Sequence, residues 1–335
     1  MRRSKKPWKT TRHRISRVST PKTTTITTPA ESISAGPKRS AATGKRNDAL
    51  RFLPWVFLAP GLIIYSVVVV YPMLYSAYLS LFRWDGVAPK KVFVGIQNYV
   101  TLLTHNEVFW IALKNNAIWL AAALLVPTSI GLGLALVLNS RFRGSHIFRS
   151  IFYFPAVLSL AVVGLIWTWI YHPDLGLANQ LLDALGLKGL KRNWLSDPQI
   201  AIYPVILAAT WNAVGLPMLL FLAGLQTIPP ELHEAAKVEG ASPRQRFWHV
   251  TFPLLRETTL IVLAITSINA LKAYDIIYAM TNGGPANRTQ LLSTWMYFLT
   301  YNYNEVGLGT AIAVVLFSLT LIFAIPYIRM MTRKV

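Results

Sequence analysis

Polar side chains occur within two apolar segments of the sequence, where they could bind a hydroxylated solute. In the first segment, Trp211, Gly215 and Met218 follow one another at helical spacing and share one face. An indole beside a glycine gap suits a sugar, because the sugar ring stacks on the indole and its hydroxyl groups can bind the amide of the neighbouring Asn212. Polar groups at the depth of a bilayer are costly and often mark a solute pathway.

The second apolar segment carries a similar set, with small and polar residues on one side of the helix and a charged pair farther toward one end. These residues are Thr266, Asn269, Ala270, Ala273, Lys272 and Asp275. A structural reading stays open for both segments, because Thr and Asn in membrane helices often hydrogen-bond a neighbouring helix. Lys272 and Asp275, three residues apart, could likewise form an ion pair near the membrane interface.

The loop between these segments, residues 228–255, has the signals of two short helices. Pro230 suits the first position of a helix, Glu231 complements the helix dipole there, and Gly240 can end the helix in a left-handed conformation. After the glycine, Ser242-Pro243-Arg244-Gln245 has the pattern of a capping box. Pro253 is expected to end the second helix.

The first of these helices has a face that a partner protein could accept. Ala235 and Ala236 keep the face narrow enough to enter a groove, and Glu234 offers an acid for an ion pair with a partner arginine. The alternative is an amphipathic helix that rests on the membrane surface. The local chemistry leaves both interpretations open.

Six segments are apolar and long enough to cross a membrane. About 20 helical residues span a hydrocarbon core of roughly 30 Å. Only 14% of the chain is charged, against roughly 25% in soluble domains. Interior prolines are tolerated in membrane bundles, where neighbouring helices satisfy the freed carbonyl groups. The sequence therefore predicts an all-α membrane protein with six transmembrane helices, at about 52–80, 111–138, 150–171, 200–225, 257–280 and 307–328.

The net charge of +20 is concentrated ahead of the first apolar segment. Residues 1–51 hold 14 of the 33 Lys and Arg residues and are rich in Thr, Ser and Pro. Such a segment cannot bury enough apolar surface to fold, so we expect a disordered cytoplasmic tail near anionic lipid headgroups rather than a nucleic-acid binder. No apolar run follows its first basic residues directly, so we expect no signal peptide.

The later basic residues predict the direction of the spans. Three Lys or Arg residues follow the second segment, four follow the fourth, and three follow the sixth. Because cytoplasmic loops are enriched in Lys and Arg, the chain is expected in the cytoplasmic (inner) membrane with both termini in the cytoplasm. Segments 82–110, 172–199 and 281–306 are then expected outside.

The sequence lacks the motifs of several other activities. It has no cysteine, and it contains no nucleotide-binding loop, no His-Glu-x-x-His motif and no Gly-x-Ser-x-Gly motif. We therefore expect neither an enzyme nor a metal site. The more serious rival is an ion-driven secondary transporter, which should show an internal repeat and membrane-embedded carboxylates. Neither is detected, since Asp275 is nearly alone in the apolar segments.

The loop resembles the EAA loop of binding-protein-dependent ABC permeases. Its pattern is Glu234-Ala235-Ala236, three residues, Gly240, nine residues and Val250-Thr251-Phe252-Pro253. The family usually ends this pattern in Ile-x-Leu-Pro. Other stretches between about 52 and 330 look like carbohydrate permeases of the maltose, lactose and glycerol-3-phosphate type: Tyr71-Pro72-x-x-Tyr75-Ser76, Phe93-Val94-Gly95-x-x-Asn98-Tyr99, Asn193-Trp194-Leu195, Leu222-Ala223-Gly224-Leu225-Gln226 and Thr281-Asn282-Gly283-Gly284-Pro285. The last of these also has the chemistry of a tight reversal.

The resemblance implies a type I importer permease with the MetI-like fold. The expected partners are a second homologous permease subunit, two ATPase subunits, an extracytoplasmic solute-binding protein, a sugar and membrane lipid. The chain itself is expected to bind no cofactor, because ATP and Mg would be bound by the ATPases. The residues expected to couple to the ATPase are Glu234, Ala235, Ala236, Gly240 and Pro253, and the two polar segments described above correspond approximately to substrate-facing stretches of the maltose-type permeases.

The expected organisation has four parts. A basic tail (1–51) precedes the first transmembrane helix with its outer segment (52–110), a permease core of five helices (111–330) and a cytoplasmic C-terminus (331–335). Within the family a neutral mono- or oligosaccharide is favoured, because a phosphorylated solute would want arginine near the pathway and only Lys272 is available. Glycerol-3-phosphate and a polyol stay open.

Overall fold

The computed structural model describes residues 48–140 and 144–332 and divides the chain into two units, Met1–Ala59 and Pro60–Val335. Of the first unit it describes residues 48–59, which form the first part of helix α1 (Asp48–Tyr65). The rest of the predicted basic tail lies outside the described residues, as do residues 333–335 of the predicted C-terminus. The boundaries of the four predicted parts stay a prediction.

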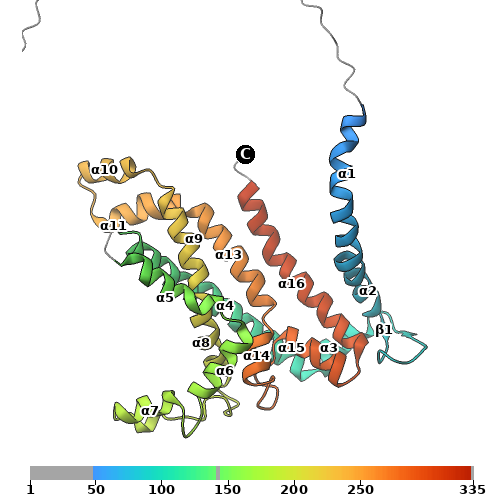
Figure 1. Ribbon diagram of the computed structural model, residues 1–335. Coiled ribbons are helices and arrows are strands. Elements are labelled where there is room, and N and C mark those ends of the chain that lie inside the picture. Colours follow the sequence, from blue (N-terminus) through green and yellow to red (C-terminus); the bar gives the residue numbers. More distant parts are fainter. Residues whose placement is uncertain (1–47, 141–143, 333–335) are drawn as a thin grey trace, which may run out of the picture. The chain divides into compact units, whose positions relative to one another are not determined.

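The described part of the second unit is helical except for one small hairpin (Figure 1). α1 continues through a π-helical turn into α2, and two short antiparallel strands follow. At the hairpin, the backbone N–H groups of Ala88 and Val87 donate hydrogen bonds to Asp85, which lowers the pKa of this carboxyl group. The bounds are η1 (Ser66–Val70), α2 (Tyr71–Leu79), β1 (Phe82–Arg83), β2 (Val92–Phe93) and α3 (Gln97–His105).

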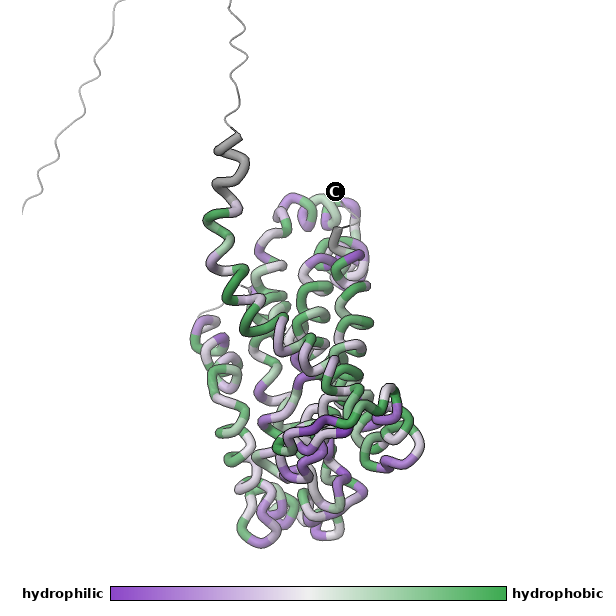
Figure 2. Tube along the Cα trace, turned by 90° about the vertical axis from the view of Figure 1, so that its right-hand side faces the viewer, coloured by the Kyte–Doolittle hydropathy of each residue, from purple (hydrophilic) through white to green (hydrophobic). Residues whose placement is uncertain are grey.

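Among the described residues, four helical stretches are long and apolar enough to span a membrane: Trp55–Leu79, Glu107–Leu138, Ile202–Gln226 and Val306–Met330. Hydrophobic residues dominate them, whereas hydrophilic residues gather in connecting segments (Figure 2). The predicted class, an all-α membrane protein, is confirmed at this level. The helices concerned, besides α1 and α2, are α4 (Glu107–Leu138), α8 (Ile202–Ala213), α9 (Gly215–Gln226) and α16 (Val306–Thr332).

Two further helix pairs reach spanning length only across a bend, which brings the number of spans in the described residues to at most six. The first pair, bent by 98°, is α5 (Ser145–Val157) and α6 (Leu160–Ile170). The segment predicted over 150–171 is therefore not one straight helix. Leu158 and Ser159 have extended backbone, and the Ser159 hydroxyl caps α6 by accepting a hydrogen bond from the N–H of Val162.

The segment predicted over 257–280 is also broken, and its helix bends by 65° from the helical stretch Pro243–Leu254 that precedes it. Lys272 and Tyr274 leave helical geometry and separate its two helices. The remaining bounds are α7 (Leu177–Ala184), η2 (Lys188–Leu190), α10 (Pro230–Val238), α11 (Pro243–Arg246), η3 (Phe247–Thr251), α12 (Phe252–Leu254), α13 (Arg256–Leu271), α14 (Asp275–Met280), α15 (Leu292–Tyr297) and η4 (Phe298–Asn302).

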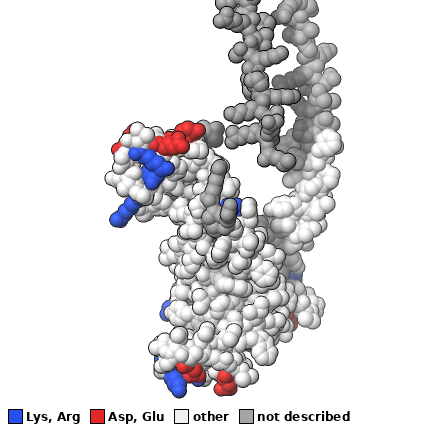
Figure 3. All heavy atoms as spheres, turned by 60° about the vertical axis from the view of Figure 1, so that its left-hand side comes forward, with Lys and Arg blue, Asp and Glu red and all other residues white. Residues whose placement is uncertain are grey.

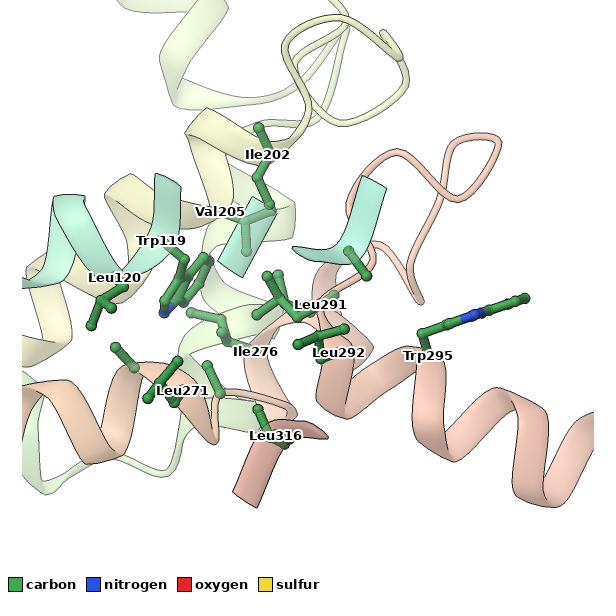
Figure 4. Close-up of a cluster of buried hydrophobic side chains, with 14 of the residues drawn as sticks. Trp119, Leu120, Ile202, Val205, Leu271, Ile276, Leu291, Leu292, Trp295 and Leu316 are labelled. Carbon is green, nitrogen blue, oxygen red and sulfur yellow. The ribbon is translucent and has the colours of Figure 1, made fainter. Parts of the chain in front are cut away.

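The main hydrophobic core joins α4, α6, α8, α14, α15 and α16 (Figure 4). Trp119 and Leu120 of α4 pack in one cluster with Val205 of α8 and Ile276 of α14, all nearly or fully buried. Such close-packed contacts leave little freedom to the helices that form them. The elements around the central cavity described below are therefore fixed by their own packing.

Glycines permit the closest helix contacts. A Cβ atom at Gly131 of α4 would lie 2.8 Å from the backbone nitrogen of Met218 and 2.8 Å from the Cβ of Pro217, both in α9. A Cβ at Gly224 of α9 would lie 2.3 Å from the Thr258 hydroxyl oxygen of α13. Small residues at such crossings allow backbones to approach in membrane bundles.

Residues 281–285 form a tight reversal of the chain, as predicted. Asn282 and Gly283 have positive φ angles of 49° and 80°, and Asn115 of α4 donates hydrogen bonds to the carbonyl oxygens of Arg288 and Gln290, at 2.8 and 2.9 Å. Because these contacts are part-buried or buried, they fix the return of the chain from α14 to α15.

Candidate functional site

Helix α10 has the predicted signals at both ends. Pro230 stands in its first turn. At its end Gly240 has a φ of +79°, and the N–H groups of Gly240 and Ala241 donate to the carbonyl oxygens of Lys237 and Ala236, at 3.0 and 2.9 Å. These two bonds form a Schellman motif, which satisfies carbonyl groups that a helix end otherwise leaves unpaired.

The second helix of the loop begins as predicted and ends within one residue of the predicted end. Ser242 and Gln245 form both bonds of a capping box, since the N–H of Ser242 donates to Oε1 of Gln245 and the N–H of Gln245 donates to Oγ of Ser242. The helical stretch continues through the π-turn η3 and ends at Leu254, where it bends by 65° into α13. The expectation that Pro253 ends this helix is therefore confirmed to within one residue.

Helix α10 buries none of its residues within the chain. Leu232 and Val238 are exposed, the latter at 89%, and both ionised and apolar side chains are therefore available on the helix surface. Charged groups of both signs gather over this end of the molecule, whereas the middle of the same face is mostly uncharged (Figure 3). A cavity of about 970 Å³ separates α10 from the nearby ends of α4, α5 and α9, and Glu234, Lys237, His233 and Arg149 line it.

A second cavity, of about 460 Å³, lies between α4, α5 with α6, α8 with α9, and α13 with α14. Its volume falls in the range of roughly 300–1,000 Å³ that small-molecule sites occupy. The lining is mostly apolar, with a few polar groups on it: Thr210, Asn212, Thr266, Asn269, Lys272, Tyr274 and Asp275. Apolar walls with a few placed polar groups are the usual design of a site for a neutral organic molecule.

The break between α13 and α14 lies on the wall of this cavity. Lys272, Tyr274 and Asp275 all line it, and the side chains of Lys272 and Asp275 are exposed. These two described residues form no salt bridge with each other, so the pairing that was the structural alternative for them is not found. Both charged side chains therefore line the cavity without pairing with each other.

The sequence was compared with models of known protein families. Residues 126–329 match the family model described as "Binding-protein-dependent transport system inner membrane component". This match covers more than half of the chain and includes the whole loop. The chain belongs to this permease family.

Two relatives agree with that assignment, and a solved structure has the same fold. The permease is 34% identical over 277 residues to the trehalose/maltose transport system permease protein MalF of Thermococcus litoralis, covering 83% of this chain and 92% of that protein. It is 35% identical over 289 residues to the sulfoquinovosyl glycerol transport system permease protein SmoG of Agrobacterium fabrum, covering 85% and 92%. The fold also matches that of a chain from a bacterial ABC transporter involved in the import of the acidic polysaccharide alginate. The TM-score is 0.73 at 24% sequence identity, and the match covers 86% of this chain and 98% of the other.

The cavity brings together seven of the ten predicted pathway residues of the permease. They are Asn212, Thr266, Asn269, Ala270, Lys272, Ala273 and Asp275. Trp211, Gly215 and Met218 do not line it. Trp211 packs edge-to-face on Trp167, with ring centroids 6.0 Å apart, Gly215 backs onto α5, and Met218 is fully buried beside Gly131. The solute role of all ten stays a prediction.

Asn212 contributes to the cavity wall in a second way. Its amide nitrogen donates hydrogen bonds to the carbonyl oxygens of Pro155 and Leu158, at the break between α5 and α6. The break leaves backbone acceptors without helical partners, and an unpaired acceptor in a membrane costs several kcal/mol. Asn212 therefore holds the bent pair in place, which is the structural role that membrane-helix amides often have.

The sequence prediction missed the aromatic lining of the cavity. Trp119 of α4 and Tyr274 of the α13–α14 break line it, and they take the place expected for Trp211. No sequence signal marked Trp119, which lies in a uniformly apolar helix. Tyr274 stands between Lys272 and Asp275, and this charged pair in an apolar segment was the available signal. Within the described ranges no group of three or more His, Cys, Asp or Glu residues could hold a metal ion.

Proposed function

We propose that this permease is the transmembrane subunit of an ATP-driven importer that carries a neutral mono- or oligosaccharide across the cytoplasmic membrane. The observation that carries the solute class is the 460 Å³ cavity, whose apolar walls hold amide, hydroxyl and aromatic groups together. Sugar hydroxyls pair with amides and hydroxyls, and their ring faces pack on aromatic side chains. The names of the relatives, which concern trehalose, maltose and sulfoquinovosyl glycerol, point the same way.

The charges of the cavity favour a neutral solute over a phosphorylated one. Lys272 is the one Lys or Arg among the described residues that line the cavity, and the carboxylate of Asp275 lies on the same wall. Phosphate recognition usually uses arginine forks or several cations. Glycerol-3-phosphate and a polyol are the alternatives within the family. An ion-driven secondary transporter is disfavoured because the family model describes a binding-protein-dependent system.

In this proposal α10 is the coupling helix of the importer. Glu234, Ala235 and Ala236, with Gly240 at the helix end, would sit in a cleft of an ATPase subunit, and Pro253 would form part of the same loop. The helix buries none of its residues within the chain, and the backbone bonds that close its C-terminal end hold its shape, which supports this role. A rigid, capped helix can transmit a rigid-body movement, whereas a frayed segment cannot.

The complete importer would contain a second, homologous permease subunit, two ATPases that bind ATP and Mg, and a solute-binding protein outside. The chain would cross the membrane six times, counting each bent pair as one span, with both termini in the cytoplasm. ATP-driven closure of the ATPases would move α10 and open the cavity outward, where the binding protein releases the sugar. Hydrolysis would return the cavity to the inward-open state.

A labelling experiment tests the direction of α10. Because the chain has no cysteine, Val238→Cys and Val87→Cys each introduce one thiol, at positions that are 89% and 85% exposed. A membrane-impermeant maleimide should label Val238→Cys only in inside-out vesicles and Val87→Cys only in right-side-out vesicles. Labelling of Val238→Cys from the outside would contradict the coupling role.

A further inference from the structure

Four tyrosines at the end of the α13–α14 break pack on one another. The ring centroids of Tyr274 and Tyr278 lie 5.4 Å apart with nearly parallel planes. Tyr297 lies against both of them, at 5.3 and 5.8 Å, and Tyr301 continues the series at 5.0 Å from Tyr297. We refer to these four residues as the tyrosine track.

The tyrosine track connects the cavity with the surface. Tyr274 lines the cavity, Tyr297 is half-buried, and the far members are open, with Tyr278 exposed at 44% and Tyr301 at 70%. The ring that lines the cavity is therefore linked through Tyr297 to Tyr301, the most exposed ring of the four.

Two departures from regular helix position these rings. The break at Lys272–Tyr274 turns Tyr274 to the cavity wall. Tyr297 is the last residue of α15, and the π-turn η4 (Phe298–Asn302), which follows at once, contains Tyr301. Single π-turns are rare and occur frequently at functional sites, where they change the direction in which a side chain points.

We propose that the tyrosine track is a binding route for the sugar, from the outer surface to the cavity. Each ring offers a face on which the C–H face of a pyranose can pack and a hydroxyl that can pair with sugar hydroxyls. A sugar that leaves water loses the hydrogen bonds of its hydration shell. A succession of tyrosine hydroxyls and ring faces can replace these contacts one after another. This inference rests on the proposed function, because it names how the same solute reaches the same cavity.

The ordinary role of an exposed tyrosine in a membrane protein is to lie at the membrane interface. Tyr203 of α8, 54% exposed and absent from the cavity lining, represents that role. Interfacial anchoring needs no ring-to-ring succession and no connection to a cavity. The tyrosine track has both.

The test uses the complete importer in proteoliposomes, with its binding protein and ATP. The probes are radiolabelled glucose, maltose, trehalose and raffinose, and the sugar taken up fastest by the unsubstituted complex is carried forward. For Tyr301→Leu we expect the uptake rate at saturating loaded binding protein to fall roughly threefold to tenfold, the range of one lost aromatic contact. Tyr301→Phe, which keeps the ring, and the control Tyr203→Leu should stay within about twofold.

Each other outcome overturns the inference in a distinguishable way. An unchanged saturating rate in Tyr301→Leu shows that the sugar does not use the ring. A raised KM for the loaded binding protein at unchanged saturating rate assigns Tyr301 to protein docking instead. An equal loss in Tyr203→Leu shows a general effect of the membrane interface. If the unsubstituted complex takes up none of the four sugars, the proposed solute class itself fails.

Discussion

Glu234→Lys is expected to abolish solute-stimulated ATP hydrolysis and uptake while the permease still folds and inserts. Glu234 is exposed and lies in a helix that buries nothing within the chain, so reversing its charge costs the isolated permease little. In the assembled importer the same side chain would meet an ATPase residue of opposite charge. Reversing one partner of such a pair costs about 2–5 kcal/mol, which lowers the stimulated rate roughly thirtyfold or more.

The matched control is Glu239, the residue that follows the last residue of the same helix. Glu239→Lys makes the same charge change five residues later, on a different side of the helix, and should keep at least about half of the stimulated rate. The measurement is ATP hydrolysis with and without loaded binding protein, together with the amount of permease that co-purifies with the ATPase. Full stimulation in Glu234→Lys would contradict the coupling role of α10.

Asn269→Leu is expected to weaken sugar transfer strongly without changing the fold. The Asn269 side chain is exposed on the cavity wall and forms no hydrogen bond with the described residues, so its amide is available to a solute. Leucine of similar size removes the amide and leaves buried sugar hydroxyls unpaired. The cost of about 1–3 kcal/mol for such groups corresponds to a roughly tenfold to hundredfold lower uptake rate at limiting sugar.

Gln199→Leu is the control for the loss of an amide. Gln199 is exposed in the segment between η2 and α8 and does not line the cavity. Its uptake should match that of the unsubstituted importer within about twofold. If Asn269→Leu also kept the full rate, the cavity between α8–α9 and α13–α14 would not be the sugar site.

Local chemistry was enough to predict the loop but not the cavity. Pro230, Gly240 and the Ser242–Gln245 pair act on their own backbone neighbours, so the sequence contains all the information for both ends of α10 and the start of α11. The predicted end of the second helix at Pro253 agrees with the observed end at Leu254 to within one residue, but the π-turn η3 before it was not predicted. A π-turn has no comparable sequence signal.

The bends and the cavity-facing side depend on contacts between distant segments. The break between α5 and α6 relies on Asn212, which is more than fifty residues away in sequence. Helical spacing predicted that Trp211, Gly215 and Met218 share a face, but it could not tell that α5 and α4 occupy that face. Thr266 and Asn269 of α13 do line the cavity, as polar groups in an apolar helix often do, but their role toward a solute stays a prediction.

The most direct test of the account is sugar uptake into proteoliposomes that contain this permease with its partner subunits. Loaded binding protein is placed outside and ATP inside, and ionophores collapse all ion gradients. The account predicts uptake that requires internal ATP and continues at the same rate with the ionophores present. Uptake without ATP, or uptake that stops when the gradients collapse although ATP is present, would contradict it.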